Sequence, residues 1–141
     1  MQCDFPEKNA TNDEIVEVLK NYKTVAIVGL STDSSKPSYR VAEYLKKQGY
    51  KIIPVNPSAK EILGEKCYPD LKSIPVKVEI VDIFRKPEAI PPIVDEAIKV
   101  GAKAIWMQLG LCHNEAAEKA RKAGLTVIMN KCIKIDHSML I

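Results

Sequence analysis

Hydrophobic and polar positions follow two repeating patterns along this chain. Five mainly apolar runs predict strands, and the first of them is continuous, which is typical of a strand buried on both faces of a sheet. They occupy residues 25–28, 50–55, 78–84, 103–107 and 126–129. Apolar residues recur at helical spacing in the segment that ends at Gly49, over residues 88–100 and over residues 114–123. Strands that alternate with helices predict right-handed crossovers and a parallel sheet.

The expected fold is therefore of the α/β class, a doubly wound five-stranded parallel sheet in the order 3-2-1-4-5 with helices on both faces. A further helix is expected over residues 12–21, with a polar capping residue at its start. Residues 58–76 have weaker periodicity and predict a loop region, with a short strand at 66–68 and a helical turn near Leu71. The C-terminal tail is compatible with short helical or extended structure.

The bulk properties narrow the class of protein. A length of 141 residues fits one domain, 1–141, in which residues 1–22 form an N-terminal helical extension. Lysine and arginine total 21 against 18 acidic residues, and this charge is spread along the chain, so it gives no reason to expect nucleic acid as a partner. The sequence has no signal peptide, no membrane-spanning run and no metal-ligand spacing of its cysteines. We expect a cytoplasmic protein that binds no membrane and no metal.

The loop after the first strand has the composition of a phosphate site. Gly29 follows the strand, hydroxyl-bearing residues follow Gly29, and a helix begins near Lys36. A helix N-terminus presents unpaired N–H groups and a partial positive charge to an anion. Because ligands of a doubly wound sheet bind beyond the carboxyl ends of its strands, the polar tips of the other strands are expected to contribute as well.

Two common nucleotide sites fit this loop poorly. Aligning Gly29 with the first glycine of G-x-G-x-x-G places Ser31 and Ser34 at the later glycine positions. The second strand ends at Asn56, where a dinucleotide site has an acidic residue for the adenosine ribose. The sequence also lacks G-x-x-x-x-G-K-[ST]. An NAD-linked redox or regulatory domain is therefore the weaker alternative.

Coenzyme A (CoA) fits the pattern better. Its additional ribose phosphate is expected at the adjacent cations Arg85 and Lys86, on the tip of the third strand. In the expected order this tip lies beside the second strand, so the adenine is placed among Pro57, Phe84 and Pro87. The diphosphate is placed at the first-strand loop, and the pantetheine extends toward the tip of the fourth strand.

Six separated motifs extend the argument to a family. They are Val-Gly-Leu-Ser at 28–31, Lys-Pro-Ser-Tyr-Arg-Val at 36–41, Ile-Pro-Val-Asn-Pro at 53–57, Val-Asp-Ile-Phe-Arg-Lys-Pro at 81–87, Trp-Met-Gln-Leu-Gly at 106–110 and Met-Asn-Lys-Cys-Ile at 129–133. With these motifs the chain resembles the small stand-alone CoA-binding proteins, whose Rossmann-like fold is similar to the CoA-binding domain of the succinyl-CoA synthetase α subunit. The resemblance implies CoA binding by the first-strand loop, the Pro-Val-Asn-Pro turn and the Phe-Arg-Lys-Pro tip, and it does not imply catalysis.

The hypothesis is therefore a CoA- or acyl-CoA-binding protein that acts as a non-catalytic carrier, sensor or regulatory module. Its expected binding residues are Gly29, Leu30, Ser31, Thr32, Lys36, Ser38, Arg40, Asn56, Pro57, Phe84, Arg85, Lys86, Gln108, Gly110 and Asn130. No catalytic residue is assigned. The alternative is an enzyme acting on acyl-CoA or CoA disulfide through Cys132 or His113, although a cysteine in apolar surroundings is more often a packing residue.

Overall fold

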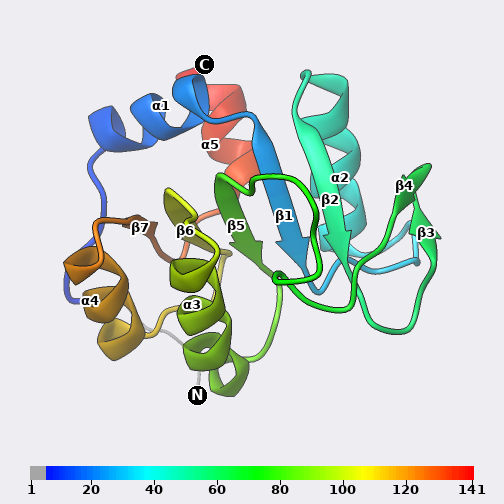
Figure 1. Ribbon diagram of the computed structural model, residues 1–141. Coiled ribbons are helices and arrows are strands. Elements are labelled where there is room, and N and C mark those ends of the chain that lie inside the picture. Colours follow the sequence, from blue (N-terminus) through cyan, green and yellow to red (C-terminus); the bar gives the residue numbers. More distant parts are fainter. Residues whose placement is uncertain (1–5) are drawn as a thin grey trace.

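The computed structural model describes residues 6–141 and shows a parallel sheet between two layers of helices (Figure 1). The sheet has five strands in the order β2-β1-β5-β6-β7. They are β1 (Thr24–Val28), β2 (Lys51–Val55), β5 (Ile80–Ile83), β6 (Ala104–Met107) and β7 (Thr126–Ile128). Apart from the first residues of β1, β2 and β7, every strand residue is buried, as the mainly apolar runs predict.

The helices cover both faces of this sheet, which confirms the doubly wound α/β class. One face carries α1 (Asn12–Asn21), α2 (Pro37–Lys47) and α5 (Ile133–Leu140), and the other carries α3 (Ile90–Lys99), preceded by the 3-10 helix η1 (Pro87–Ala89), and α4 (Asn114–Lys122). Because successive strand residues point to opposite faces, each strand contributes to both cores. In β5, Ile80 packs with α1, α2 and α5, whereas Val81 packs with α3 and α4.

Helix α1 begins where its sequence provides a cap. The side chain of Thr11 accepts a hydrogen bond from Glu14 N, and the Glu14 carboxylate accepts one from Thr11 N, over 3.2 and 2.9 Å. This capping box satisfies two of the N–H groups that a helix start leaves unpaired. Ile15 and Leu19 then place fully buried side chains against the sheet. The helix predicted over residues 12–21 is therefore present.

The strand order is consistent with an arrangement of the predicted 3-2-1-4-5 type, but the third apolar run has a different place in it than expected. The third apolar run, β5, pairs with β1 and not with β2, so it lies inside the sheet. The place outside β2 is taken by the segment around Tyr68, which forms a single parallel bridge to Val55. If the segment around Tyr68 is counted as the third strand, β5 becomes the fourth strand and β6 the fifth. The order is then 3-2-1-4-5, with β7 beyond the fifth strand. The neighbour of the β5 tip is therefore β1, not the second strand.

Residues 58–76 contain more regular structure than their weak periodicity predicts. Strands β3 (Glu61–Ile62) and β4 (Glu65–Lys66) form a separate antiparallel pair. Near Leu71, where a helical turn was predicted, the chain forms a turn that is not part of a helix and is closed by a hydrogen bond of 3.2 Å from Ile74 N to Leu71 O. The short strand predicted at 66–68 is reduced to the end of β4 and the bridge described above.

The C-terminal tail forms helix α5, which packs beside α1 and α2. Its buried His137 lies with Nδ1 2.7 Å from Tyr44 Oη and meets the rings of Tyr44 and Tyr50 edge to face. Burial, together with the positive charge of Lys23, lowers the pKa of His137 below its ordinary value of 6.5. Neither α5 nor any other helix in residues 6–141 is long and apolar enough to cross a membrane.

Candidate functional site

The carboxyl ends of the strands lie along one edge of the sheet, because all neighbouring strands run in parallel. We call this edge the rim. Each strand is followed at the rim by a residue named in the sequence analysis. In the order from β2 to β7, these residues are Asn56, Gly29, Phe84, Gln108 and Asn130. The crossover from β2 to β5 passes over β1, so the strand order reverses between β1 and β5. A ligand crevice is expected at this point.

Gly29 allows the tips of β1 and β5 to approach each other closely. Its φ of +91° is a left-handed conformation, and a Cβ there would lie 2.4 Å from Phe84 O and 2.9 Å from Arg85 Cδ. A hydrogen bond of 2.8 Å from Phe84 N to Val28 O joins the same tips. Glycine is thus required for its conformation and for space, and the Arg85 side chain lies directly beside it.

The loop between β1 and α2 is held in shape by its own polar groups. Ser38 Oγ accepts from Ser31 N, and Ser31 Oγ accepts from Asp33 N, both over 3.0 Å. Asp33 Oδ1 accepts from the N–H and the hydroxyl of Ser35 over 2.9 and 2.7 Å. These hydrogen bonds lower the pKa of the Asp33 carboxyl below its usual value of 3.8. The hydroxyls that the sequence suggests for phosphate therefore first serve to fix the loop.

Some donors of this loop nevertheless face outward. The N–H groups of Thr32 and Ser34 make no hydrogen bond to the part of the chain that the structure describes. Both residues are exposed, as are Lys36, which precedes α2, and Arg40 on its first turns. Leu30, by contrast, is fully buried, so its side chain contributes to the core instead of to a ligand.

Two asparagines connect neighbouring tips of the rim. Asn56 Nδ2 donates to Leu30 O over 3.0 Å, and Asn56 Oδ1 accepts from Ser58 N over 2.8 Å. Asn130 Oδ1 accepts from Gly110 N over 2.7 Å, and Asn130 has a φ of 56°, which asparagine tolerates better than most residues. These atoms are engaged within the protein, so both side chains position the loops around a site.

A cavity of about 800 Å³ opens at the rim between the start of α2, the β5 tip, the β6 tip and Cys132, and we call it the rim cavity. The predicted residues that it brings together are Phe84, Arg85, Lys86, Gln108 and Gly110. The other predicted residues lie outside its walls: Gly29, Leu30, Ser31, Thr32, Lys36, Ser38, Arg40, Asn56, Pro57 and Asn130. The β5 and β6 tips, with the start of α2, therefore form its centre.

The predicted adenine contacts divide between two cavities. Phe84 and Pro87 line the rim cavity, whereas Pro57 lines a separate cavity of about 240 Å³ on the α3 side of the sheet. Arg85 borders both cavities. The division follows from the observed strand order, because β1 separates the β5 tip from the β2 tip that carries Pro57. These three residues do not form one adenine pocket.

Most of the walls that sequence reasoning missed are apolar, although Glu88 also lines the rim cavity. Pro37 and Val41 of α2 and Leu109 and Leu111 of the β6–α4 loop line the rim cavity. Leu109 is 60% exposed, which is a large exposure for a leucine. Leucines on both sides of Gly110, in a loop that follows a strand tip, are the sequence signal that could have identified this wall. This apolar wall suits an uncharged part of a ligand that also contacts the cationic β5 tip.

Gln108 offers an amide group to the rim cavity. The residue is 6% exposed, and its Oε1 accepts from Ile133 N over 3.1 Å. Because an N–H group can donate only to the oxygen, this contact fixes which way the amide faces. Its Nε2 has no hydrogen-bond partner within residues 6–141 and is not enclosed by protein. The NH₂ group is therefore free to donate to a ligand.

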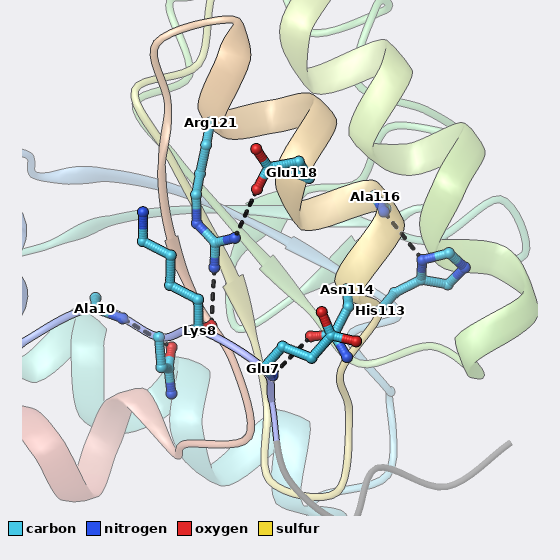
Figure 2. Close-up of polar contacts among 9 residues, drawn as sticks. Glu7, Lys8, Ala10, His113, Asn114, Ala116, Glu118 and Arg121 are labelled. Carbon is cyan, nitrogen blue, oxygen red and sulfur yellow. Dashed lines mark hydrogen bonds and ion pairs between the residues drawn. The ribbon is translucent and has the colours of Figure 1, made fainter.

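Of the two alternative catalytic candidates, Cys132 alone borders the rim cavity, as a free and partly exposed thiol. His113 instead caps α4, where its Nδ1 accepts from Ala116 N over 3.1 Å (Figure 2). Among the residues that the structure describes, no histidine lines the rim cavity. His113 and Cys132 are therefore not brought together as base and nucleophile.

A second hollow of about 940 Å³ lies between α3, α4 and the N-terminal segment, away from the rim cavity. Figure 2 shows how its polar groups are used. Arg121 donates to Lys8 O over 2.9 Å and contacts Glu118 at 3.5 Å, while Glu7 N donates to Asn114 Oδ1 over 3.1 Å. These contacts fasten the N-terminal segment to α4. No group of three metal-ligating side chains occurs within residues 6–141, in this hollow or elsewhere.

Comparison with known proteins identifies the family of this chain. Residues 23–138 match the family described as CoA binding domain, and the chain belongs to this family. The match begins just before β1 and ends within α5, so it includes every strand of the main sheet and the whole rim. Helix α1 lies outside it.

Some relatives have the same extent as this chain. The uncharacterized protein YneT of Bacillus subtilis (strain 168) is 39% identical over 132 residues, which are 94% of this chain and 98% of YneT. A solved structure of a hypothetical protein from Pyrococcus horikoshii OT3 is 41% identical, with a TM-score of 0.91 over 99% of both chains.

Other relatives contain the domain within a longer chain. The α subunit of acetate–CoA ligase [ADP-forming] II from Pyrococcus furiosus is 29% identical over 129 residues, which are 84% of this chain and 28% of the subunit. The structure of dinucleotide-forming acetyl-coenzyme A synthetase 1 from Ca. Korarchaeum cryptofilum gives a TM-score of 0.72 at 28% identity, over 82% of this chain and 28% of the synthetase. The chain thus spans little more than a quarter of these two proteins.

Proposed function

We propose that this chain binds CoA in the rim cavity, as a non-catalytic carrier, sensor or regulatory module. One observation carries the proposal: in a member of the CoA binding domain family, the rim cavity places Arg85 and Lys86 beside an apolar wall. CoA has the matching division, with phosphates at its nucleotide end and an uncharged pantetheine arm. Cations and an apolar wall in one cavity favour such a ligand over a purely polar one.

The exposed side chains of Arg85 and Lys86 are suited to the 3′-phosphate, because charge-assisted contacts to phosphate are the stronger class of hydrogen bond. For the diphosphate, the exposed β1–α2 loop offers the N–H groups of Thr32 and Ser34, which have no partner in the described chain. The pantetheine arm has the leucines of the β6–α4 loop to pack against, and Gln108 Nε2 is a donor for one of its carbonyls.

The composition of the rim cavity supports binding without turnover. Acyl transfer through a cysteine needs a base that activates the thiol and donors that stabilise the oxyanion. The described walls hold Cys132 but no histidine, and no metal-ligating group of three lies in the described chain. An enzyme that acts on acyl-CoA or CoA disulfide is the alternative, and an NAD-linked domain is a second one.

Calorimetric titration tests the proposal. We expect CoA to bind at least about tenfold more tightly than dephospho-CoA, since one charge-assisted contact is worth about 1.5–3 kcal/mol. The double variant Arg85→Ala, Lys86→Ala should lose this preference. The matched control Lys51→Ala, Lys103→Ala removes two exposed cations near the opposite edge of the sheet and should keep it.

The outcomes separate the alternatives. Equal affinities for CoA and dephospho-CoA contradict the phosphate assignment, and binding of NAD without binding of CoA contradicts the proposal as a whole. In parallel samples with acetyl-CoA, free thiol should appear no faster than in buffer alone. Continuous thiol release that is lost in the Cys132→Ser variant would favour the enzyme alternative.

A further inference from the structure

Cys132 is a reactive group that CoA binding leaves without a role. It is a free thiol, it is partly exposed, and it borders the rim cavity. The other free cysteine of the described chain, Cys67, is buried among apolar residues on the α2 side, and burial raises its pKa. Cys67 therefore provides an internal comparison for any chemistry at Cys132.

The backbone around Cys132 is held against the β6 tip. Lys131 N donates to Met107 O over 3.4 Å, and Ile133 N donates to Gln108 Oε1 over 3.1 Å. The indole of Trp106 adds a hydrogen bond of 2.8 Å from Nε1 to Lys131 O. Contacts on both sides of Cys132 thus fix it at the cavity wall, so its place there does not depend on a mobile loop.

Gln108 independently indicates a ligand at this part of the wall. Only 6% of the residue is exposed, yet its Nε2 lacks a hydrogen-bond partner within residues 6–141. Because this donor opens to the rim cavity and has no partner in the described chain, it is available to a carbonyl of a ligand there. Pantetheine carries amide carbonyls along the arm that ends in the CoA thiol.

The order of the tips sets the direction of the bound molecule, on the basis of the proposed function. The cations Arg85 and Lys86 follow β5, Gln108 follows β6, and Cys132 follows β7. A CoA molecule whose 3′-phosphate lies at the β5 tip and whose arm crosses the β6 tip therefore directs its sulfur toward Cys132. The 3′-phosphate, the carbonyls of the arm and the sulfur would meet cations, an amide donor and a thiol in that sequence.

We propose that Cys132 is a site of covalent modification by CoA through thiol–disulfide exchange. The Cys132 thiolate attacks one sulfur of CoA homodisulfide, a Cys132–CoA disulfide forms, and the CoA–CoA disulfide breaks. The CoA thiolate that leaves keeps the electron pair of the broken S–S bond and then takes up a proton. Cys132 released one proton when its thiolate formed, so the protons balance. One disulfide is consumed and one is formed, so no further oxidant is needed, and a thiol reductant reverses the step. The protein thereby retains CoA covalently under oxidising conditions and releases it under reducing ones.

The experiment uses the whole chain, freed of reductant, with CoA homodisulfide as the probe and intact-mass spectrometry as the readout. We expect one CoA per chain, located at Cys132 by peptide mapping and removed by dithiothreitol. The Cys132→Ser variant should acquire no adduct. The matched variant Cys67→Ser should be modified at the parental rate.

Pantethine, the disulfide of pantetheine, tests whether the cavity guides the reaction, because it has the same sulfur chemistry and no phosphates. We expect it to modify Cys132 at least about tenfold more slowly than CoA homodisulfide at equal concentration. Equal rates overturn the inference, as does the absence of an adduct in a protein that binds CoA in calorimetry. If calorimetry shows no CoA binding, the proposed function itself fails, so the two failures are distinguishable.

Discussion

Gly29 shows how a single residue can set the geometry of the rim. At Gly49, which also has a positive φ of +92°, an added Cβ would have no neighbour within 4 Å. At Gly29 it would meet the backbone oxygen of Phe84, which cannot move without shifting the β5 tip. The cost of a side chain at Gly29 thus combines backbone strain with a steric clash, whereas at Gly49 only the strain applies.

Alanine substitutions at these two glycines therefore form a matched pair. We expect Gly49→Ala to lower the free energy of unfolding by about 1 kcal/mol, and Gly29→Ala to lower it by a further ~1–3 kcal/mol, the usual cost of overpacking. Urea denaturation measures both values. Gly29→Ala should also weaken CoA binding in calorimetry, because it displaces Arg85. Equal destabilisation by the two substitutions would contradict the close approach seen in the structure.

At the level of helices and strands, the buried imidazole of His137 contributes to the packing of helix α5. His137 packs between Tyr44 and Tyr50, and Tyr50 Oη in turn donates to Leu19 O in α1. Because the pKa of His137 is lower in the folded state, the unfolded chain takes up a proton more readily. The stability from this packing is therefore fully present above the unfolded pKa of about 6.5 and is lost as the pH falls through the folded pKa.

The variant His137→Phe keeps a ring at this position and removes its titration. At pH 8 it should be less stable than the parent by about 1 kcal/mol, because the hydrogen bond with Tyr44 is lost. As the pH falls from 7 to 5, the parent should lose stability relative to the variant. Urea midpoints across this range measure the effect. A difference that is constant with pH would show that His137 does not titrate on unfolding.

At the scale of the whole molecule, the centre of the sheet contains a carboxyl without a hydrogen-bond partner in residues 6–141. Asp82 in β5 is fully buried between Ile27 of β1 and Trp106 of β6, and neither of its carboxylate oxygens has a hydrogen-bond partner in the described chain. Burial raises the pKa of this carboxyl well above its usual 3.8. The folded state holds the proton more tightly than the unfolded state, so the stability due to Asp82 declines as the pH rises above that value.

The substitution Asp82→Asn removes this titration from the core. We expect the variant to gain stability relative to the parent between pH 5 and pH 8, in the opposite direction to the effect of His137. Global unfolding in urea, followed by circular dichroism, measures the difference at each pH. Asp95→Asn changes a carboxylate paired with Lys119 on the surface and serves as the control. If the Asp82→Asn difference does not grow with pH, Asp82 is not the titrating group.

Most helices and strands were predictable from local patterns, because strand and helix periodicities depend on neighbours in the chain. The apolar runs located β1 and β6, and the hydroxyl-rich loop and the Phe84–Lys86 tip were correctly placed at one edge of the sheet. Tertiary structure alone decided that β5 lies beside β1, since pairing between distant strands depends on how the whole core packs. It also decided that Ser38 and Asn56 hold loops in place, because a polar side chain bonds to whatever group the fold brings near it.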